Sequence, residues 1–238
     1  MQFDPPLVSA RLLRRYKRFL ADVQLDNKTG PVVAHCGNPG SMIGLAEPGS
    51  TVWLSPNQNP KAKLDWRWEL VDTGTSLVSV NTNRANAIVA EVLKCGAIDE
   101  LKDYASIRPE VRYGTNSRID FLLESDEKPT AYVEVKSVTL RRPDGNHPEA
   151  AEFPDAVTQR GTKHLRELQE ILKTGARAVM LFLVQREDCR YFTPAGDIDP
   201  VYSAELIAAR DAGVEILCYG CRITPQSIEL DKRLPVRL

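Results

Sequence analysis

The sequence predicts an α/β protein in which a small β-rich domain precedes a larger domain built on a mixed sheet. Two observations indicate this. Near the start, short β-like runs alternate with Gly, Pro and Asn turns, whereas the rest alternates helix-like and strand-like segments in the order α-β-β-β-α-β-α-β. The pattern changes near residue 82, so we expect domains at 1–82 and 83–238. A chain of 238 residues accommodates both.

The first domain is expected to be a small antiparallel barrel or sandwich. Its strand-like runs are separated by turns rich in Gly, Pro and Asn, and the runs lie at 32–35, 51–54, 66–71 and 76–80. About five short strands in such a length make a barrel of the oligonucleotide/oligosaccharide-binding (OB) type the first candidate. Periodicity alone does not separate this barrel from other small barrels.

A basic cluster lies at the start of this domain, although the net charge of the whole chain is only −1. No acidic residue interrupts the cluster before Asp22, and its members are Arg11, Arg14, Arg15, Lys17 and Arg18. The segment 12–20 fits a strand or a helix. Cations interleaved with Tyr16 and Phe19 suit a DNA surface, where charge neutralises phosphate and rings stack on bases. The alternative is a solvated, basic edge strand, which blocks edge-to-edge pairing.

The second domain shows helix and strand signals in alternation. A helix begins after Thr82 or Asn83 and ends at Gly96, and a long helix follows from about 158 to 173. The run 178–184 is continuously apolar, as in a strand buried on both faces. Further strands are expected at 111–114, 118–123, 131–138 and after Gly213, with a short helix at 204–211.

Three ionisable residues occupy otherwise apolar strands of this domain, and they carry the candidate chemistry. Glu134 and Lys136 lie on one face of their strand, and a polar turn can bring Asp120 of the preceding strand beside them. Burying such groups is costly unless they are paired or bind a metal. An E-x-K triplet alone is not specific, since residues 100–102 form another one. The strand context and the upstream Asp120 make the pattern informative.

Two carboxylates and a main-chain carbonyl, that of Val135, suit Mg²⁺ or Mn²⁺, which prefer oxygen ligands. Such an ion at Asp120 and Glu134 would polarise a phosphate and activate water. Lys136 would orient the attacking water and stabilise negative charge. The alternative is a buried salt bridge between Lys136 and the two acids.

Two helices are candidates to complete the site. Glu91 lies close to the apolar face of the first helix and is either a further metal ligand or a solvated carboxylate. The start of the long helix carries Arg160 and Lys163, either as a phosphate site or as an ordinary polar helix start. His164 is expected to be a packing or surface histidine.

Other features exclude several classes of protein. The five cysteines are odd in number and scattered, which argues against a secreted disulfide framework. No apolar run approaches the length of about 20 residues that a membrane helix needs. Residues 1–7 lack the pattern of a signal peptide, so we expect a cytoplasmic protein that does not associate with membranes.

At these residues the sequence resembles the sugar fermentation stimulation protein A (SfsA) family, and the resemblance extends from end to end. The segments that carry it are His35-Cys36-Gly37-Asn38-Pro39-Gly40-Ser41-Met42, residues 80–83 with the helix after them, 117–121, 132–136 and 153–161. This resemblance implies an OB-type domain followed by a nuclease-like domain of the PD-(D/E)xK type. The nuclease pattern then falls on Asp120, Glu134 and Lys136, with Glu91 as the helix acid.

The resemblance further implies DNA binding without sequence preference and a regulatory link to the use of maltose and other sugars. Two hypotheses follow: a DNA-binding protein that also cuts DNA with Mg²⁺, and a non-catalytic DNA-binding regulator on a nuclease scaffold. A third hypothesis, a sugar-binding enzyme, would depend on Trp53, Trp66 and Trp68 as stacking residues. We expect those three to be core or barrel-surface aromatics instead.

Overall fold

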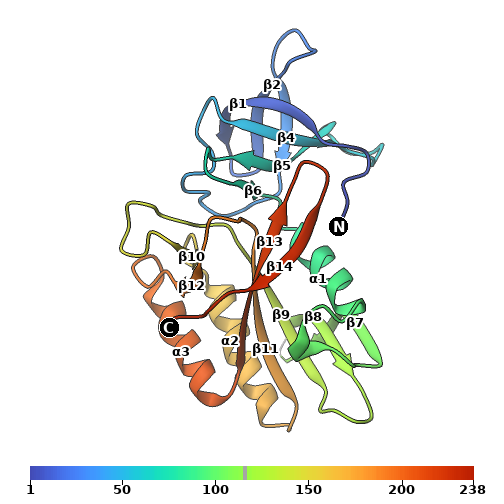
Figure 1. Ribbon diagram of the computed structural model, residues 1–238, viewed down its shortest axis with the longest axis vertical. Helices are drawn as coiled ribbons and strands as arrows, with labels where there is room; N and C mark the ends of the chain where they lie inside the picture. Colours follow the sequence, from blue (N-terminus) through green and yellow to red (C-terminus); the bar gives the residue numbers. More distant parts are fainter. Residues whose placement is uncertain (115–116) are drawn as a thin grey trace.

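The computed structural model describes residues 1–114 and 117–238 and confirms the predicted fold class (Figure 1). An OB-type barrel lies above a mixed α/β domain in this view. The strands of the barrel are β1 Val8–Tyr16, β2 Leu20–Leu25, β3 Val32–Cys36, β4 Thr51–Pro56, β5 Trp66–Asp72 and β6 Leu77–Ser79.

The barrel closes because β3 pairs with two partners. The strands are ordered β3-β2-β1-β4-β5-β6, and β3 also pairs in parallel with β5, through Ala34↔Trp66 and Cys36↔Trp68. The ring of β1 to β5 surrounds a core in which Trp68 is fully buried and donates to the Leu70 carbonyl at 2.9 Å. Trp66 is partly buried against the same barrel core, and Trp53 is partly buried against a core of the second domain. All three indoles therefore pack against apolar residues, which removes the support for the sugar-stacking hypothesis.

The basic segment forms a strand and a turn rather than a helix. β1 ends at Tyr16, and Lys17 and Arg18 take positive φ values of 48° and 62° in the turn to β2. The register of β1 against β2 shifts between Leu12 and Arg14, so the alternation of a regular strand is broken there. Up to Leu13 the strand alternates, with Leu12 fully buried and Leu13 40% exposed, whereas Arg14 is exposed although it lies two residues after Leu12.

The second sheet has the order β14-β13-β11-β9-β8-β7, and β9, β11 and β13 run parallel. Its strands are β7 Ser106–Tyr113, β8 Ser117–Glu124, β9 Ala131–Val138, β11 Arg177–Val184, β13 Glu215–Ile223 and β14 Ile228–Arg233. A separate parallel pair, β10 Ala150–Phe153 and β12 Tyr191–Pro194, adjoins it. Strands β10, β12 and β14 were not predicted from the sequence.

Helices cover both faces of this sheet. Helix α1, Arg84–Lys94, packs on the face that carries Val133 and Val135. Helices α2, Gln159–Leu172, and α3, Pro200–Ala212, cover the opposite face, and the short 3₁₀ helix η1 spans Asp99–Leu101.

The helix boundaries follow their capping residues. Thr158 caps α2 by accepting the Gly161 N–H, so the helix begins close to its predicted start near residue 158. Helix α3 begins four residues before its predicted start, because Asp199 caps it by accepting the Tyr202 N–H and a proline occupies its first turn.

The two domains are joined by backbone pairing as well as by the chain. The Ser79 N–H donates to the Gln185 carbonyl at 3.0 Å, and Val78 forms an antiparallel bridge with Arg186. At the N-terminus, Gln2 bridges to Ser227 and the Phe3 side chain joins the core beneath α1. Segments from the start, middle and end of the chain therefore meet between the barrel and the sheet.

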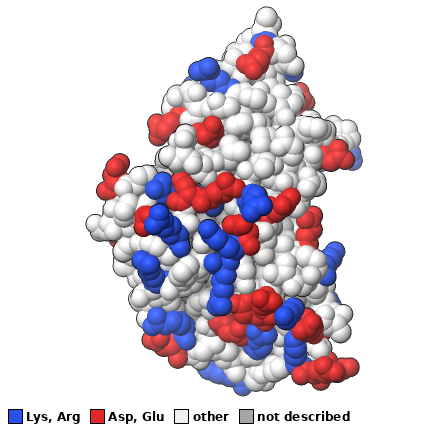
Figure 2. Space-filling model, in the orientation of Figure 1, with Lys and Arg blue, Asp and Glu red and all other residues white. Residues whose placement is uncertain are grey.

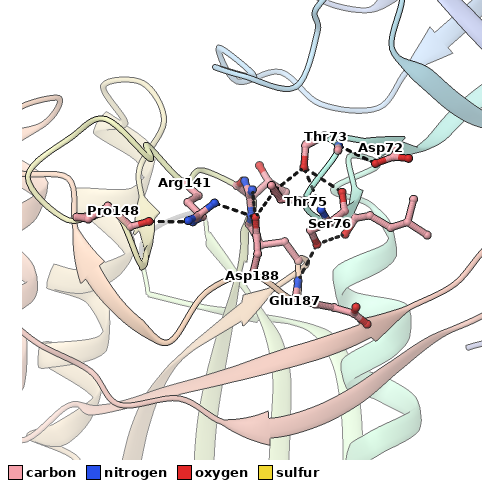
Figure 3. Close-up of polar contacts among 12 residues, drawn as sticks. Asp72, Thr73, Thr75, Ser76, Arg141, Pro148, Glu187 and Asp188 are labelled. Atoms are coloured by element: carbon pink, nitrogen blue, oxygen red, sulfur yellow. Dashed lines mark hydrogen bonds and ion pairs between the residues drawn. The ribbon is translucent and has the colours of Figure 1, made fainter.

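A polar cluster reinforces this connection (Figure 3). The Thr75 hydroxyl, from the barrel domain, donates to Asp188 of the second domain at 2.9 Å. Asp188 also accepts from the guanidinium groups of Arg186, at 2.6 Å and 2.9 Å, and Arg141, at 3.1 Å. Burial opposes the ionisation of Asp188, but Arg186, the Thr75 hydroxyl and Arg141 outweigh it, so the pKa of Asp188 lies below its ordinary value.

We predict that Asp188→Ala lowers the free energy of unfolding by about 3 kcal/mol, because it leaves the buried Arg186 without its partner. Because the folded-state pKa of Asp188 is lowered, its contribution is complete above the ordinary carboxyl pKa of about 3.9 and is lost as pH falls through the lower folded value. Urea denaturation of wild type and Asp188→Ala between pH 3 and 7 measures this. The exposed Asp126→Ala is the control, and equal stabilities of Asp188→Ala and wild type at pH 7 would contradict the prediction.

Candidate functional site

The site begins where strands β8 and β9 separate. Their backbone pairing extends from Leu123↔Ala131 to Phe121↔Val133 and goes no further. Beyond it, the Asp120 carboxylate accepts the Val135 N–H at 2.7 Å. The carboxylate therefore takes the place of a main-chain acceptor, and this fixes Asp120 beside β9 at the end of the ladder.

Glu134 and Lys136 lie on the same face of β9, as the alternation predicts. Glu134 is 2% exposed, and the Lys136 ammonium donates to its Oε1 at 2.7 Å. His164 of α2 is also buried, and its Nδ1 contacts the same oxygen. The Lys136 ammonium and the His164 Nδ1 are themselves 3.3 Å apart. One carboxylate oxygen therefore organises an amine from the sheet and an imidazole from the helix.

The second oxygen of Glu134 differs from the first. Oε2 is buried and has no hydrogen-bond partner among the described residues. Burial opposes the ionisation of Glu134, but Lys136 and His164 outweigh it and hold the pKa of Glu134 below its ordinary value. Glu134 is thus an ionised carboxylate whose Oε2, a strong acceptor, has no donor among the described residues.

Asp120 shows the opposite shift. Burial and the negative charge of Glu134 raise its pKa, and the Val135 N–H, Asn86 and Lys136 offset this only in part. The two carboxylates therefore repel each other in a poorly solvated place, where a bound cation would favour the ionised form of both.

Helix α1 contributes Asn86 rather than Glu91. The Asn86 side-chain amide donates to Asp120 Oδ1 at 2.7 Å. Glu91 instead forms an ion pair with the Met1 amino group at 2.7 Å, and its side chain is 59% exposed. Five residues along a helix turn the direction of the side chain by about 140°, so the two side chains leave α1 on different sides. The only sequence signal for Asn86 was its place in the first turn.

These residues border a cavity of about 870 Å³ between the barrel and the α/β domain. The α/β domain contributes Asn86, Asp120, Glu134, Lys136, Arg160 and His164 to its lining. The barrel contributes Arg15, Arg18 and the loop 38–41. The candidate site is therefore shared by both domains.

Comparison with known proteins assigns both domains to one family. Residues 13–80 match the family model of the SfsA N-terminal OB domain, and residues 83–227 match that of the sugar fermentation stimulation protein RE domain. The chain belongs to the sugar fermentation stimulation protein family. This confirms the resemblance seen in the sequence.

Similar proteins match along the whole chain. The sugar fermentation stimulation protein homologs of Roseobacter denitrificans and Paramagnetospirillum magneticum are each 55% identical, over 100% of this chain and 100% and 98% of their own. The structure of Pyrococcus furiosus SfsA in complex with Ca²⁺ is similar with a TM-score of 0.88 and 26% identity, over 100% of this chain and 98% of that one.

The basic residues predicted to bind DNA have different surroundings in this member of the SfsA family. Arg15 donates to the carbonyls of the loop 38–41, and Arg14 pairs with Asp22 at 2.7 Å. Arg18 borders the cavity, while Arg11 and Lys17 are exposed. On the face shown in Figure 2, positive and negative side chains are interleaved over the lower domain.

The two basic residues at the start of α2 also have different surroundings. Arg160 borders the cavity, and its Nε lies 3.4 Å from Nε2 of His164. Lys163 donates to the Ser117 hydroxyl at 3.1 Å and lies 3.5 Å from a Glu167 oxygen. The expectation that His164 is a packing or surface residue missed its contact with Glu134. Its signal in the sequence was a position one turn after Arg160 on the same helix face.

Two further findings bear on the predicted metal and on membranes. Across residues 1–114 and 117–238, no three or more His, Cys, Asp or Glu side chains are gathered as a ready set of metal ligands. No described helix is long and apolar enough to cross a membrane.

We predict that Asp120→Asn stabilises the protein in EDTA, because the neutral amide removes the repulsion by Glu134. The new side chain still accepts the Val135 N–H, and the Asn86 amide can rotate to pair with it. Because the folded-state pKa of Asp120 is raised, the wild type loses stability as pH rises from about 4 through that raised value. Asp120→Asn does not titrate there, so its advantage over the wild type appears above the raised pKa. Each kcal/mol corresponds to roughly 2–4 °C in Tm. Thermal unfolding from pH 4 to 8 tests this against Asp126→Asn, and a lower Tm for Asp120→Asn at neutral pH would contradict it.

Proposed function

We propose that this protein binds DNA without sequence preference and hydrolyses phosphodiester bonds with Mg²⁺ or Mn²⁺. The observation that carries the proposal is the pair of the half-buried Asp120 and the buried Glu134, beside a cavity that Arg15, Arg18 and Arg160 also border. The Glu134 oxygen Oε2 has no hydrogen-bond donor among the described residues. Arrangements of acidic groups and a lysine at the end of a strand pair suit phosphoryl chemistry. The Ca²⁺ in the structure of Pyrococcus furiosus SfsA supports a hard cation that takes oxygen ligands.

The oxygen atoms of the site fit such a cation. Glu134 Oε2 has no hydrogen-bond partner among the described residues, and each Asp120 oxygen accepts one hydrogen bond although it has room for another. The Val135 main-chain carbonyl is the proposed third ligand. Two carboxylates and few other ligands match the preference of Mg²⁺, which keeps several of its waters. When bound, the ion supplies positive charge that polarises a phosphate and lowers the pKa of water.

The remaining side chains act on the substrate. Lys136, held 2.7 Å from Glu134, can orient a water and stabilise negative charge on a phosphate. Arg160 and Arg18 border the cavity from different domains, so a DNA backbone between them would be neutralised from both sides. Binding of this kind depends on counterion release and weakens steeply with salt.

A second candidate function is a non-catalytic DNA-binding regulator linked to maltose and other sugar use. It is favoured by the pairing of both Lys136 and His164 with Glu134 Oε1, which satisfies much of the charge without a metal. The family name connects relatives of this chain with sugar fermentation. Both functions share DNA binding and differ in the use of a cation.

For the proposed nuclease, we predict that supercoiled plasmid and single-stranded DNA are cut with Mg²⁺ or Mn²⁺ and not with EDTA. Glu134→Gln and Lys136→Met should each lower the rate at least about 100-fold, because the first removes a charged ligand of the cation and the second removes a positive charge at the reacting phosphate. Gel assays measure the rates, with the exposed Glu127→Gln as a matched control. Cutting that survives in Glu134→Gln would place the activity elsewhere. Salt-sensitive binding without any cutting would identify the regulator.

A second prediction concerns the cation itself. Ca²⁺ should raise the Tm of wild type, since saturation at 100 times Kd stabilises the folded state by about 2.7 kcal/mol. Glu134→Gln should lose this shift, and Ca²⁺ should reverse the advantage of Asp120→Asn over wild type seen in EDTA. Differential scanning fluorimetry with Ca²⁺ or EDTA measures both effects. An equal Ca²⁺ shift in wild type and Glu134→Gln would contradict the proposed ligands.

A further inference from the structure

A loop of the barrel forms one wall of the candidate site and is tied at both ends. We name residues 37–42, Gly-Asn-Pro-Gly-Ser-Met, the strap. Its first end lies against the segment that leads into α1, where the Thr82 hydroxyl donates to the Gly37 carbonyl at 2.9 Å. A Cβ at Gly37 would collide with the Asn81 side chain. The strap therefore starts in close contact with the linker between the domains.

The second end of the strap is tied to the segment that leads into α2. The Ser41 hydroxyl donates to the Asp155 carbonyl at 2.5 Å, and the Met42 N–H donates to the Asp155 carboxylate at 3.1 Å. Gly40 packs so tightly against the same carboxylate that a Cβ there would overlap with it. Asp155 thus holds the barrel against the second domain a few residues before α2.

Arg15 braces the strap from within the barrel. Its guanidinium donates to the carbonyls of Asn38 and Gly40, each at 2.9 Å, and of Ser41 at 3.4 Å. Three carbonyls bound by one planar cation leave the strap little freedom to move. Arg15, which is predicted to bind DNA, therefore also shapes the cavity.

The strap consequently connects the approaches to two helices that cover opposite faces of the sheet. Residues 38–41 line the same cavity as Asp120 and Glu134, so the strap bounds the space in front of the carboxylates. The cavity volume of about 870 Å³ falls within the range of pockets that enclose small ligands. A space of this size is small beside a duplex, which presents two strands around a major groove about 12 Å wide.

We infer that the site admits an unpaired strand of nucleic acid and excludes an intact duplex. This inference rests on the proposed function and names the substrate class of the same site. The arginines that border the cavity contact the backbone of the strand, and the strap prevents the second strand from following it. An intact duplex then binds only to outer surfaces, through contacts that weaken with salt.

The test compares a labelled 30-nucleotide single strand with a blunt duplex of the same sequence. Cleavage is measured with Mn²⁺, and binding by fluorescence anisotropy with Ca²⁺ at about 0.2 M salt, where outer phosphate contacts are weak. Wild type should cut and bind the single strand at least tenfold better than the duplex. Asp155→Ala removes the carboxylate that holds the strap, and Gly40→Ala introduces a Cβ that would overlap with that carboxylate. Each variant should bring the ratio of single-strand to duplex cutting, and the same ratio for binding, towards one. Asp126→Ala is the matched control, and Tm values verify folding.

A variant that fills the cavity tests whether the single strand binds there. Ala156 borders the cavity, so Ala156→Trp should weaken single-strand binding, whereas the same change at the exposed Ala105 should not. Equal cutting of both substrates by wild type would overturn the inference and leave the nuclease intact. If wild type cuts neither substrate, the proposed nuclease function fails and the binding ratio decides the inference. A preference that persists unchanged in both strap variants would also overturn it.

Discussion

The geometry of the site depends on the end of the ladder between β8 and β9. Because the main-chain pairing stops at Phe121↔Val133, the Val135 N–H needs another acceptor, and the Asp120 carboxylate supplies it. This hydrogen bond sets Asp120 of β8 beside Glu134, which directly precedes Val135 on β9. Two acids are thus brought together by a requirement of the backbone rather than by attraction between their side chains.

The surrounding protein stabilises this unfavourable arrangement. Val133 and Val135 point into the core beneath α1, and Met180 and Phe182, the β11 neighbours of Glu134 and Lys136, belong to the core beneath α2. These apolar contacts hold β9 in place while its polar side chains remain poorly solvated. Sites of this kind store a destabilisation that the rest of the fold must offset.

How much of this could be predicted from sequence depended on whether the signal was local. Alternation along β9 places Glu134 and Lys136 on one face, and Thr158 is recognisable as a cap, since both features depend on neighbours in the chain. Asn86 and His164 reach the site from helices whose rotation is set by packing against the sheet. The register shift after Leu12 likewise has no local signal, so the side of β1 on which Arg14 and Arg15 lie could not be predicted from the sequence.

The cavity itself depends on how the two domains are held. Ser79 and Val78 continue the barrel into the second domain by backbone pairing, and Asp188 is bound by groups from both domains. The strap adds a separate connection through Asp155, on the other side of the linker. Two connections at different places oppose a hinge motion about either one alone. These connections hold the walls of the site in place, so the proposed selection among substrates would depend on the shape of a preformed cavity rather than on closure around the ligand.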